Sequence, residues 1–177
     1  MTTRAKDVKP LLQGLNQEAF AIVDLQDEIR VDRLCHDLLR HFNQTLTQTS
    51  GFSPIQAGVL CQGADYFLRE FLVADRRVNL FTINAERIRQ FAGHWYIVRT
   101  AEPNLTELQA ILAGTAAFYD FLARQDLFPA AVAAEIAIAC EDVAYYQKRI
   151  DDFWAIEGDG YERWCRDCPL EPVPDIS

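Results

Sequence analysis

The sequence predicts an all-α protein of five to six helices, arranged as an antiparallel bundle or a compact orthogonal array, with an irregular C-terminal tail. Three observations lead to this prediction. Apolar residues recur three or four positions apart along most of the chain, which is the period of an amphipathic helix. The breaks between periodic segments are short, and the apolar run at residues 78–82 is too short to indicate a sheet. Half of the 177 residues are hydrophobic, enough to bury a core.

We expect one helical domain over residues 1–157, because no repeat or long linker divides the chain. Two helices precede the first clear loop: a short one over residues 8–15 and a longer one over residues 17–47. The apolar stripe of the longer helix slips near Val31, which indicates a kink or a break into two helices.

Three further helices begin at residues that commonly cap a helix. We expect them over about residues 54–74, 85–97 and 105–122. The predicted caps, in chain order, are Ser53 followed by Pro54 at the first helical position, then Thr82 or Asn84, then Asn104 or Thr106.

A last long helix is expected over residues 130–156, after the turn that ends at Pro129. Beyond Gly158-Asp159-Gly160 we find no further helical period. Residues 158–177 are therefore expected to be an irregular tail, packed on the helical domain or extending from it.

The formal charge of −9 is unevenly distributed. Residues 101–177 hold 5 Lys and Arg against 15 Asp and Glu, whereas residues 51–100 hold 6 against 4. A protein that binds nucleic acid needs a basic face to neutralise phosphates. Charge therefore disfavours a nucleic-acid partner for the whole molecule, and only the middle of the chain offers a candidate face, through Arg69, Arg76, Arg77, Arg87 and Arg89.

Segments that direct a protein to or through a membrane are not found in the sequence. No run reaches the ~18 uncharged apolar residues that span a bilayer, and the first residues lack the apolar region of a secretory signal. We therefore expect a cytoplasmic protein without a membrane partner.

Two of the five cysteines form a Cys-x-x-Cys motif, Cys165 and Cys168. This spacing can place two thiolates on one zinc ion or allow a reversible disulfide. The sequence supplies neither a second such motif nor the βαβ unit that usually surrounds a redox pair. We therefore favour no cofactor, with zinc at this pair as the alternative, and interpret the other three cysteines as small buried hydrophobes.

Neighbouring aromatic residues occur on the helix expected over residues 130–156. They are Tyr145 with Tyr146 and Phe153 with Trp154. Adjacent residues in a helix point about 100° apart, so both members of a pair cannot face one core. We expect some of this aromatic surface to meet a partner, a ligand or the C-terminal tail.

The segments Tyr66–Leu72 and Ala117–Ala131 resemble the core-binding domain of tyrosine recombinases, mainly in the Phe-Tyr-x-Phe-Leu helix end followed by a short turn and a proline. The resemblance covers about residues 64–135. It implies a small SAM-like helical module that clamps DNA, with the central arginines facing it. The catalytic domain of such enzymes is missing from this sequence, so the resemblance does not imply recombinase activity.

No phosphate loop, nucleophile elbow or zinc-protease motif occurs, so we favour a protein that is not an enzyme. Our leading hypothesis is a helical interaction protein that acts through self-association or through a protein partner. One alternative is a nucleic-acid-associated module that uses the central arginines. Another is a metal-binding or thiol-redox protein that uses Cys165 and Cys168.

Overall fold

The structure is a computed structural model that describes Leu12 and residues 14–174. Within these residues all regular structure is helical, which confirms the all-α prediction, and the helices number seven, more than the five to six expected. They are α1 (Leu25–Gln48), α2 (Pro54–Asp65) continued by the π-helical η2 (Tyr66–Arg76), α3 (Ala85–Gln90) continued by the π-helical η4 (Phe91–Trp95) and by α4 (Tyr96–Arg99), α5 (Leu105–Arg124), α6 (Ala130–Cys140), α7 (Val143–Trp154) and α8 (Gly160–Asp167).

Two short 3₁₀ turns, η1 (Gln17–Phe20) and η3 (Leu80–Thr82), complete the element order. The helix expected over residues 8–15 lies almost wholly outside the described residues. No helix in the described part of the chain combines the length and hydropathy needed to cross a membrane.

The break predicted near Val31 lies earlier, between η1 and α1. Asp24 is the N-cap of α1, and its side chain accepts a hydrogen bond from the backbone N–H of Asp27 at 2.8 Å. The buried stripe of α1 then runs regularly from Val31 to Leu46. The slip arose because the apolar residues of the first turns, such as Leu25, are exposed and do not belong to that stripe.

The predicted caps are largely confirmed. Ser53 caps α2 in a reciprocal capping box with Gln56, and Pro54 is the first helical residue. Asn84 caps α3 and Asn104 caps α5, each through its side-chain oxygen. Asn was thus the correct choice at both positions where Thr was the alternative.

The helix expected over residues 130–156 is interrupted, because the chain leaves helical geometry at Asp142 between α6 and α7. The hydroxyl of Tyr146 donates a 2.7 Å hydrogen bond to the carbonyl of Ala139, near the end of α6. This bond gives a buried partner to a carbonyl in the last turn of that helix. Residues 140–143 contain neither glycine nor proline, so the break leaves no local signal in the sequence.

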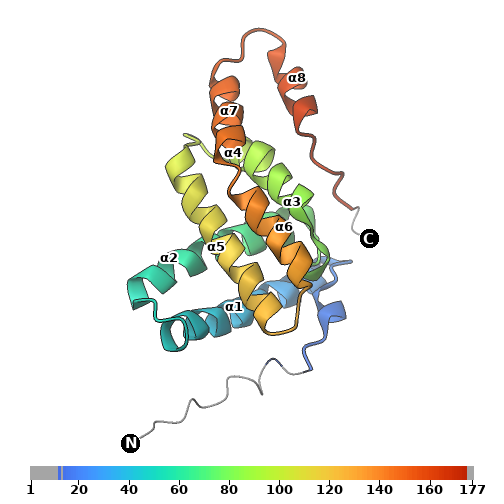
Figure 1. Ribbon diagram of the computed structural model, residues 1–177. Helices are drawn as coiled ribbons and strands as arrows, with labels where there is room; N and C mark the ends of the chain where they lie inside the picture. The colour runs from blue at the N-terminus through green and yellow to red at the C-terminus, as the bar shows by residue number, and fades with distance from the viewer. Residues whose placement is uncertain (1–11, 13, 175–177) are drawn as a thin grey trace, which may run out of the picture.

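The C-terminal tail begins with a helix, where an irregular segment was expected. Tyr161, Trp164, Cys165 and Cys168 are spaced as one face of a helix, but α8 is only eight residues long and lies between glycine and proline. In Figure 1, α8 folds back beside α7, and the chain then returns past α3. The tail therefore packs on the helical domain.

Helix α5 lies at the centre of the fold, with α2 and α6 packed against it (Figure 1). Two glycines allow α2 and α5 to cross in close contact. A Cβ atom on Gly114 would lie 2.2 Å from the carbonyl oxygen of Leu60, and one on Gly63 would lie 2.7 Å from that of Ala110. Gly63 and Gly114 thus serve helix packing, as small residues in a helical pattern often do.

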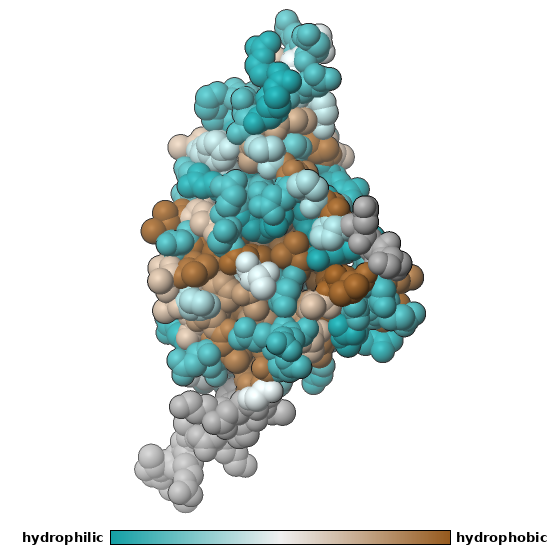
Figure 2. All heavy atoms as spheres, turned by 90° about the vertical axis from the view of Figure 1, so that its right-hand side faces the viewer, coloured by the Kyte–Doolittle hydropathy of each residue, from teal (hydrophilic) through white to brown (hydrophobic). Residues whose placement is uncertain are grey.

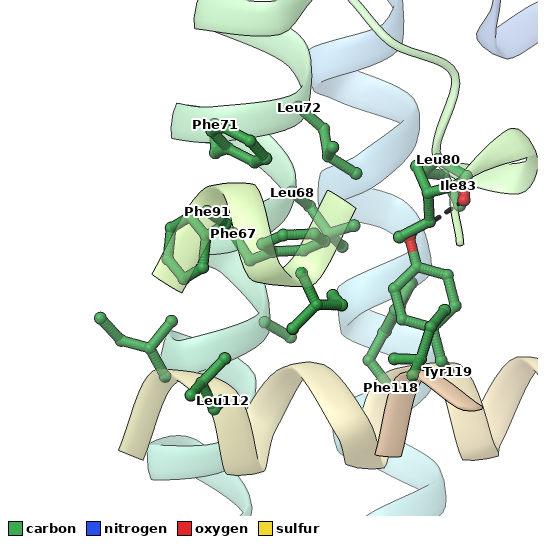
Figure 3. Packing of buried hydrophobic residues seen from close by; sticks show 14 of the residues in the cluster. Phe67, Leu68, Phe71, Leu72, Leu80, Ile83, Phe91, Leu112, Phe118 and Tyr119 are labelled. Atoms are coloured by element: carbon green, nitrogen blue, oxygen red, sulfur yellow. Dashed lines mark hydrogen bonds between the residues drawn. The ribbon is translucent and has the colours of Figure 1, made fainter. Parts of the chain in front are cut away.

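The core fills the space between α5, η2 and η4. Figure 3 shows Phe67 and Phe71 of η2 beside Phe91 of η4, above the side chains of α5. On α5, the buried hydroxyl of Tyr119 donates a 3.0 Å hydrogen bond to the carbonyl of Leu80. This bond attaches the loop before α3 to the central helix.

Candidate interaction surface

The aromatic residues predicted to form an interaction surface are largely covered by the C-terminal segment, defined here as residues 160–174. Tyr146 is fully buried, which corrects its assignment to a surface. Phe153 is half-buried and packs against Trp164 of α8, with ring centroids 5.2 Å apart. Tyr145 is also half-buried, and Trp154 alone of the four stays exposed. The tail is thus the main partner of this aromatic surface.

Arg149 of α7 anchors α8 to the rest of the molecule. Its buried guanidinium donates hydrogen bonds to the carbonyls of Gly93 and Trp164, both at 2.8 Å, and lies 3.9 Å from the centre of the Trp164 ring. In return, the indole N–H of Trp164 donates to the carbonyl of Arg149 at 3.0 Å. Arg149 therefore joins α7, η4 and α8 by polar bonds and a cation–π contact.

His94 holds the chain just after α8. Its Nδ1 lies 2.6 Å from the carbonyl oxygen of Cys168, so Nδ1 carries the proton and donates it. Burial lowers the pKa of His94, with Arg149 and Arg76 contributing in the same direction. The hydrogen bond to the Cys168 carbonyl opposes this lowering of the pKa, so burial and the two arginines, rather than the bond itself, favour the neutral imidazole.

The two cysteines of the Cys-x-x-Cys motif have different surroundings. Cys168 is buried, and its thiol donates to the carbonyl of Arg89 at 3.4 Å. Burial raises the pKa of this thiol and so disfavours the thiolate that metal binding or disulfide exchange needs. Cys165 is half-exposed. No group of three or more metal-ligating side chains occurs within the described residues, so the zinc alternative gains no further ligand there.

The five arginines proposed to face nucleic acid all lie beside carboxylates. Each has a side-chain nitrogen within 4 Å of an Asp or Glu oxygen. The pairs are Arg69 with Asp32 and Asp65, Arg76 with Asp75, Arg77 with Glu28, Arg87 with Glu171, and Arg89 with Asp142. Their positive charge is therefore compensated within the chain, and they do not form the basic face that phosphate binding requires.

Helix α2 presents an apolar surface that sequence reasoning missed. Its inner side buries Ala57, Gly63 and Ala64 against the fold. On its outer side Ile55 is 81% exposed and Val59 is 50% exposed, one helical turn apart. Together with the exposed Phe52, which precedes the helix, they form a stripe that we call the α2 outer face.

Two hollows flank the α2 outer face. One, of about 260 Å³, has Phe52 in its wall together with residues of α1 and α5, among them the ion pair of Asp120 and Arg124. The other, of about 180 Å³, lies between α2 and α5 and is lined by Val59, Tyr66, Ala110 and, at its edge, Glu107. Ile55, between Phe52 and Val59 in the sequence, is the most exposed residue of the α2 outer face.

A sequence signal for this surface exists, although it is not a motif. Residues 41–64 contain no Asp, Glu, Lys or Arg, in a chain of which 24% is charged. Depletion of charge is characteristic of the core of protein interfaces. The charge-free run is visible only when charges are counted over short segments, because counts over longer ranges combine it with charged residues on either side.

A second apolar surface lies at the start of α1, where Val23, Leu25 and Ile29 are exposed. Charged residues interrupt it at Asp24, and again at positions 27, 28 and 30. Figure 2 shows the side of the molecule where α1 begins, and apolar and hydrophilic residues lie next to one another there. This surface lacks the freedom from charge that distinguishes the α2 outer face.

Comparison of the chain with protein-family models, curated proteins and solved structures finds no match in any of the three. The resemblance of residues 64–135 to the core-binding domain of tyrosine recombinases therefore stays a prediction.

Proposed function

We propose that this chain is a non-enzymatic helical protein that acts through self-association, with the α2 outer face as its contact surface. The observation that carries the proposal is the exposure of Ile55 and Val59 on a helix without Lys, Arg or Glu and with Asp65 only at its end. Apolar contiguous surface that is not covered within a chain marks an interaction site.

A second copy of the chain fits this surface better than a foreign partner does. In a two-fold dimer the same patch meets itself, so a charge near the two-fold axis would face a like charge. Two chains that each carry a net charge of −9 repel one another, and this repulsion opposes contact least where the surface lacks charge. Residues 41–64 provide such a place.

The shape of the α2 outer face also favours self-association. The face is held rigidly, because the capping box fixes the start of α2 and the glycine crossing fixes the helix on α5. The exposed Ile55 and Val59 therefore offer an apolar contact on a helix that needs no rearrangement to meet a second copy. We place this association in the cytoplasm, because all five cysteines are free thiols, as is usual in a reducing compartment.

Sedimentation velocity of the full chain tests the proposal. We expect the wild type to sediment as a dimer at micromolar concentration. Ile55→Asp should sediment as a monomer, because it adds one carboxylate per chain to an exposed apolar position, leaves the core intact, and buries that charge without a partner when two copies meet. Ile138→Asp is the matched control: Ile138 is 67% exposed on α6, outside the α2 outer face, and this variant should remain a dimer. A wild type that stays monomeric up to several hundred micromolar would overturn the proposal.

A further inference from the structure

Near its end, the C-terminal segment places Glu171 in a small polar site beside α3. The side chain of Glu171 lies 2.5 Å from Nη2 of Arg87 and 3.3 Å from Nε2 of Gln90. The backbone carbonyl of the same residue accepts a 3.0 Å hydrogen bond from Nη1 of Arg76. Three side chains from two helices, η2 and α3, thus converge on one acidic residue.

The receiving side of this contact is preorganised. Gln90 is only 3% exposed, and its amide oxygen accepts a 3.0 Å hydrogen bond from Nη1 of Arg87, which turns the amide nitrogen toward the carboxylate. The side chains of Arg76 and Arg87 are each 12% exposed, whereas that of Glu171 is 56% exposed. The site is therefore built into the helical body, and its occupant lies on the outside.

The charge of the site calls for an anionic occupant. Asp75 pairs with both Arg76 and Arg99 and compensates one positive charge of the two. Arg87 has Glu171 as its carboxylate partner. Without Glu171 the site would keep a net positive charge beside a buried amide donor, and such a site selects a carboxylate.

The same groove also recognises the backbone before Glu171. His94 donates to the carbonyl of Cys168, and the Cys168 side chain lies against Gly93, where an added Cβ would come within 3.2 Å of its sulfur. Residues 169–174 have no helical structure. The groove thus accepts a small buried side chain and an acidic side chain three positions later, on an extended segment.

The occupant is held by few contacts. In α8, Trp164 is the buried residue, and the other side chains of the helix are exposed or half-exposed. Gly158, with φ of 58°, connects the segment to α7. Beyond α8, Cys168 is buried and Leu170 is half-buried against the core. A segment held by these few side chains and a few polar bonds opens more readily than the core does.

We infer that the groove formed by Arg76, Arg87, Gln90 and His94 is a binding site for an acidic extended peptide, which residues 168–171 occupy within the chain and which a peptide of the same chemistry from another chain occupies when the segment opens. This site shares no residue with the α2 outer face: Arg76 lies at the far end of the helix formed by α2 and η2, and the other members lie on α3 and η4.

Thiol labelling of Cys168 in the full-length wild type tests the inference, because this buried thiol reacts only when the segment opens. The probe is a peptide with the sequence of residues 166–174 in which serine replaces the cysteine. We expect this peptide to raise the labelling rate of Cys168 in proportion to its concentration, because it takes the place of residues 168–171 in the groove and so increases the population of the open segment. Labelling of the half-buried Cys61 on α2, resolved by mass spectrometry, should not change.

Two matched comparisons decide the outcome. A peptide with glutamine in place of its glutamate should leave the labelling rate unchanged. In the full-length Arg87→Gln variant, Cys168 should be labelled faster without peptide and should no longer respond to it. Equal responses to the acidic and the glutamine peptide, or no response to either, would overturn the inference.

Discussion

The surface beneath the C-terminal segment is covered within the chain, whereas the α2 outer face stays exposed. The segment brings negative charge and one tryptophan to a surface that is rich in arginine and aromatic residues, and covers it. The α2 outer face has no charge and is covered by nothing within the described residues. Aromatic content therefore indicated a surface that the chain itself covers, and the lack of charge indicates the surface that we propose for self-association.

The largest expected loss of stability comes from disrupting the crossing of α2 and α5, which supports the α2 outer face. Gly114→Ala places a Cβ 2.2 Å from the backbone oxygen of Leu60, so α2 and α5 must separate. We expect a loss of about 3 kcal/mol in the free energy of unfolding, measured with urea. Gly58→Ala on α2, the helix that Gly114 faces, is the control: its Cβ would meet nothing within 4 Å, and the free energy of unfolding should rise by about 0.5–1 kcal/mol.

A loss of similar kind is expected when the anchor of the C-terminal segment is removed. Arg149→Met leaves the carbonyls of Gly93 and Trp164 without this donor, and each buried polar group left unpaired is costly. We expect a loss of about 2–3 kcal/mol in the same urea experiment. Arg166→Met, at an exposed ion pair in α8, should change the value by less than about 0.5 kcal/mol. Equal effects of the two substitutions would show that Arg149 is no anchor.

A smaller and more local effect is expected at Gly93. In Gly93→Ala the new methyl would lie 3.2 Å from Cys168 Sγ and from a ring carbon of Tyr145, and both side chains can shift a little. We expect a loss of about 1 kcal/mol, together with faster thiol labelling of Cys168. Sedimentation should be unchanged, because the α2 outer face is remote from this site. A change in association without a change in labelling would contradict the separation of the two regions.

The smallest expected effect is a dependence on pH. The pKa of His94 is lowered in the folded chain from its ordinary value of 6.5, so the unfolded chain binds the proton more readily. Stability should therefore be highest above pH 6.5 and should fall as the pH drops below it. His94→Gln keeps a donor for the Cys168 carbonyl, and in this variant the thermal unfolding temperature should change less with pH over this range. An unchanged slope in the variant would assign the effect to another group.

The sequence allowed prediction of what local chemistry determines. Ser53 with Pro54, Asn84 and Asn104 begin helices because their side chains bond to the first backbone N–H groups, and this needs no tertiary contact. The interruption at Asp142 and the pairing of Arg87 with Glu171 depend on residues 7 to 84 positions apart, which a local pattern does not reveal.

The candidate surface was predictable only in part. The rule that adjacent aromatic residues cannot share one core correctly indicated that some of them meet another segment, and Phe153 does so at Trp164. The rule does not say which segment covers them, and Tyr146 turned out to be buried. The charge-free run at residues 41–64 was present in the sequence, but its exposure is known only once α2 is placed on α5.

The dependence of association on salt tests the central claim most directly. If two chains of charge −9 meet through an uncharged face, screening should weaken their repulsion without weakening the contact. Sedimentation equilibrium of the wild type should therefore show a dimer that becomes tighter as sodium chloride is raised from low to physiological concentration. A dimer that weakens with salt would indicate an interface of ion pairs, and would contradict the account.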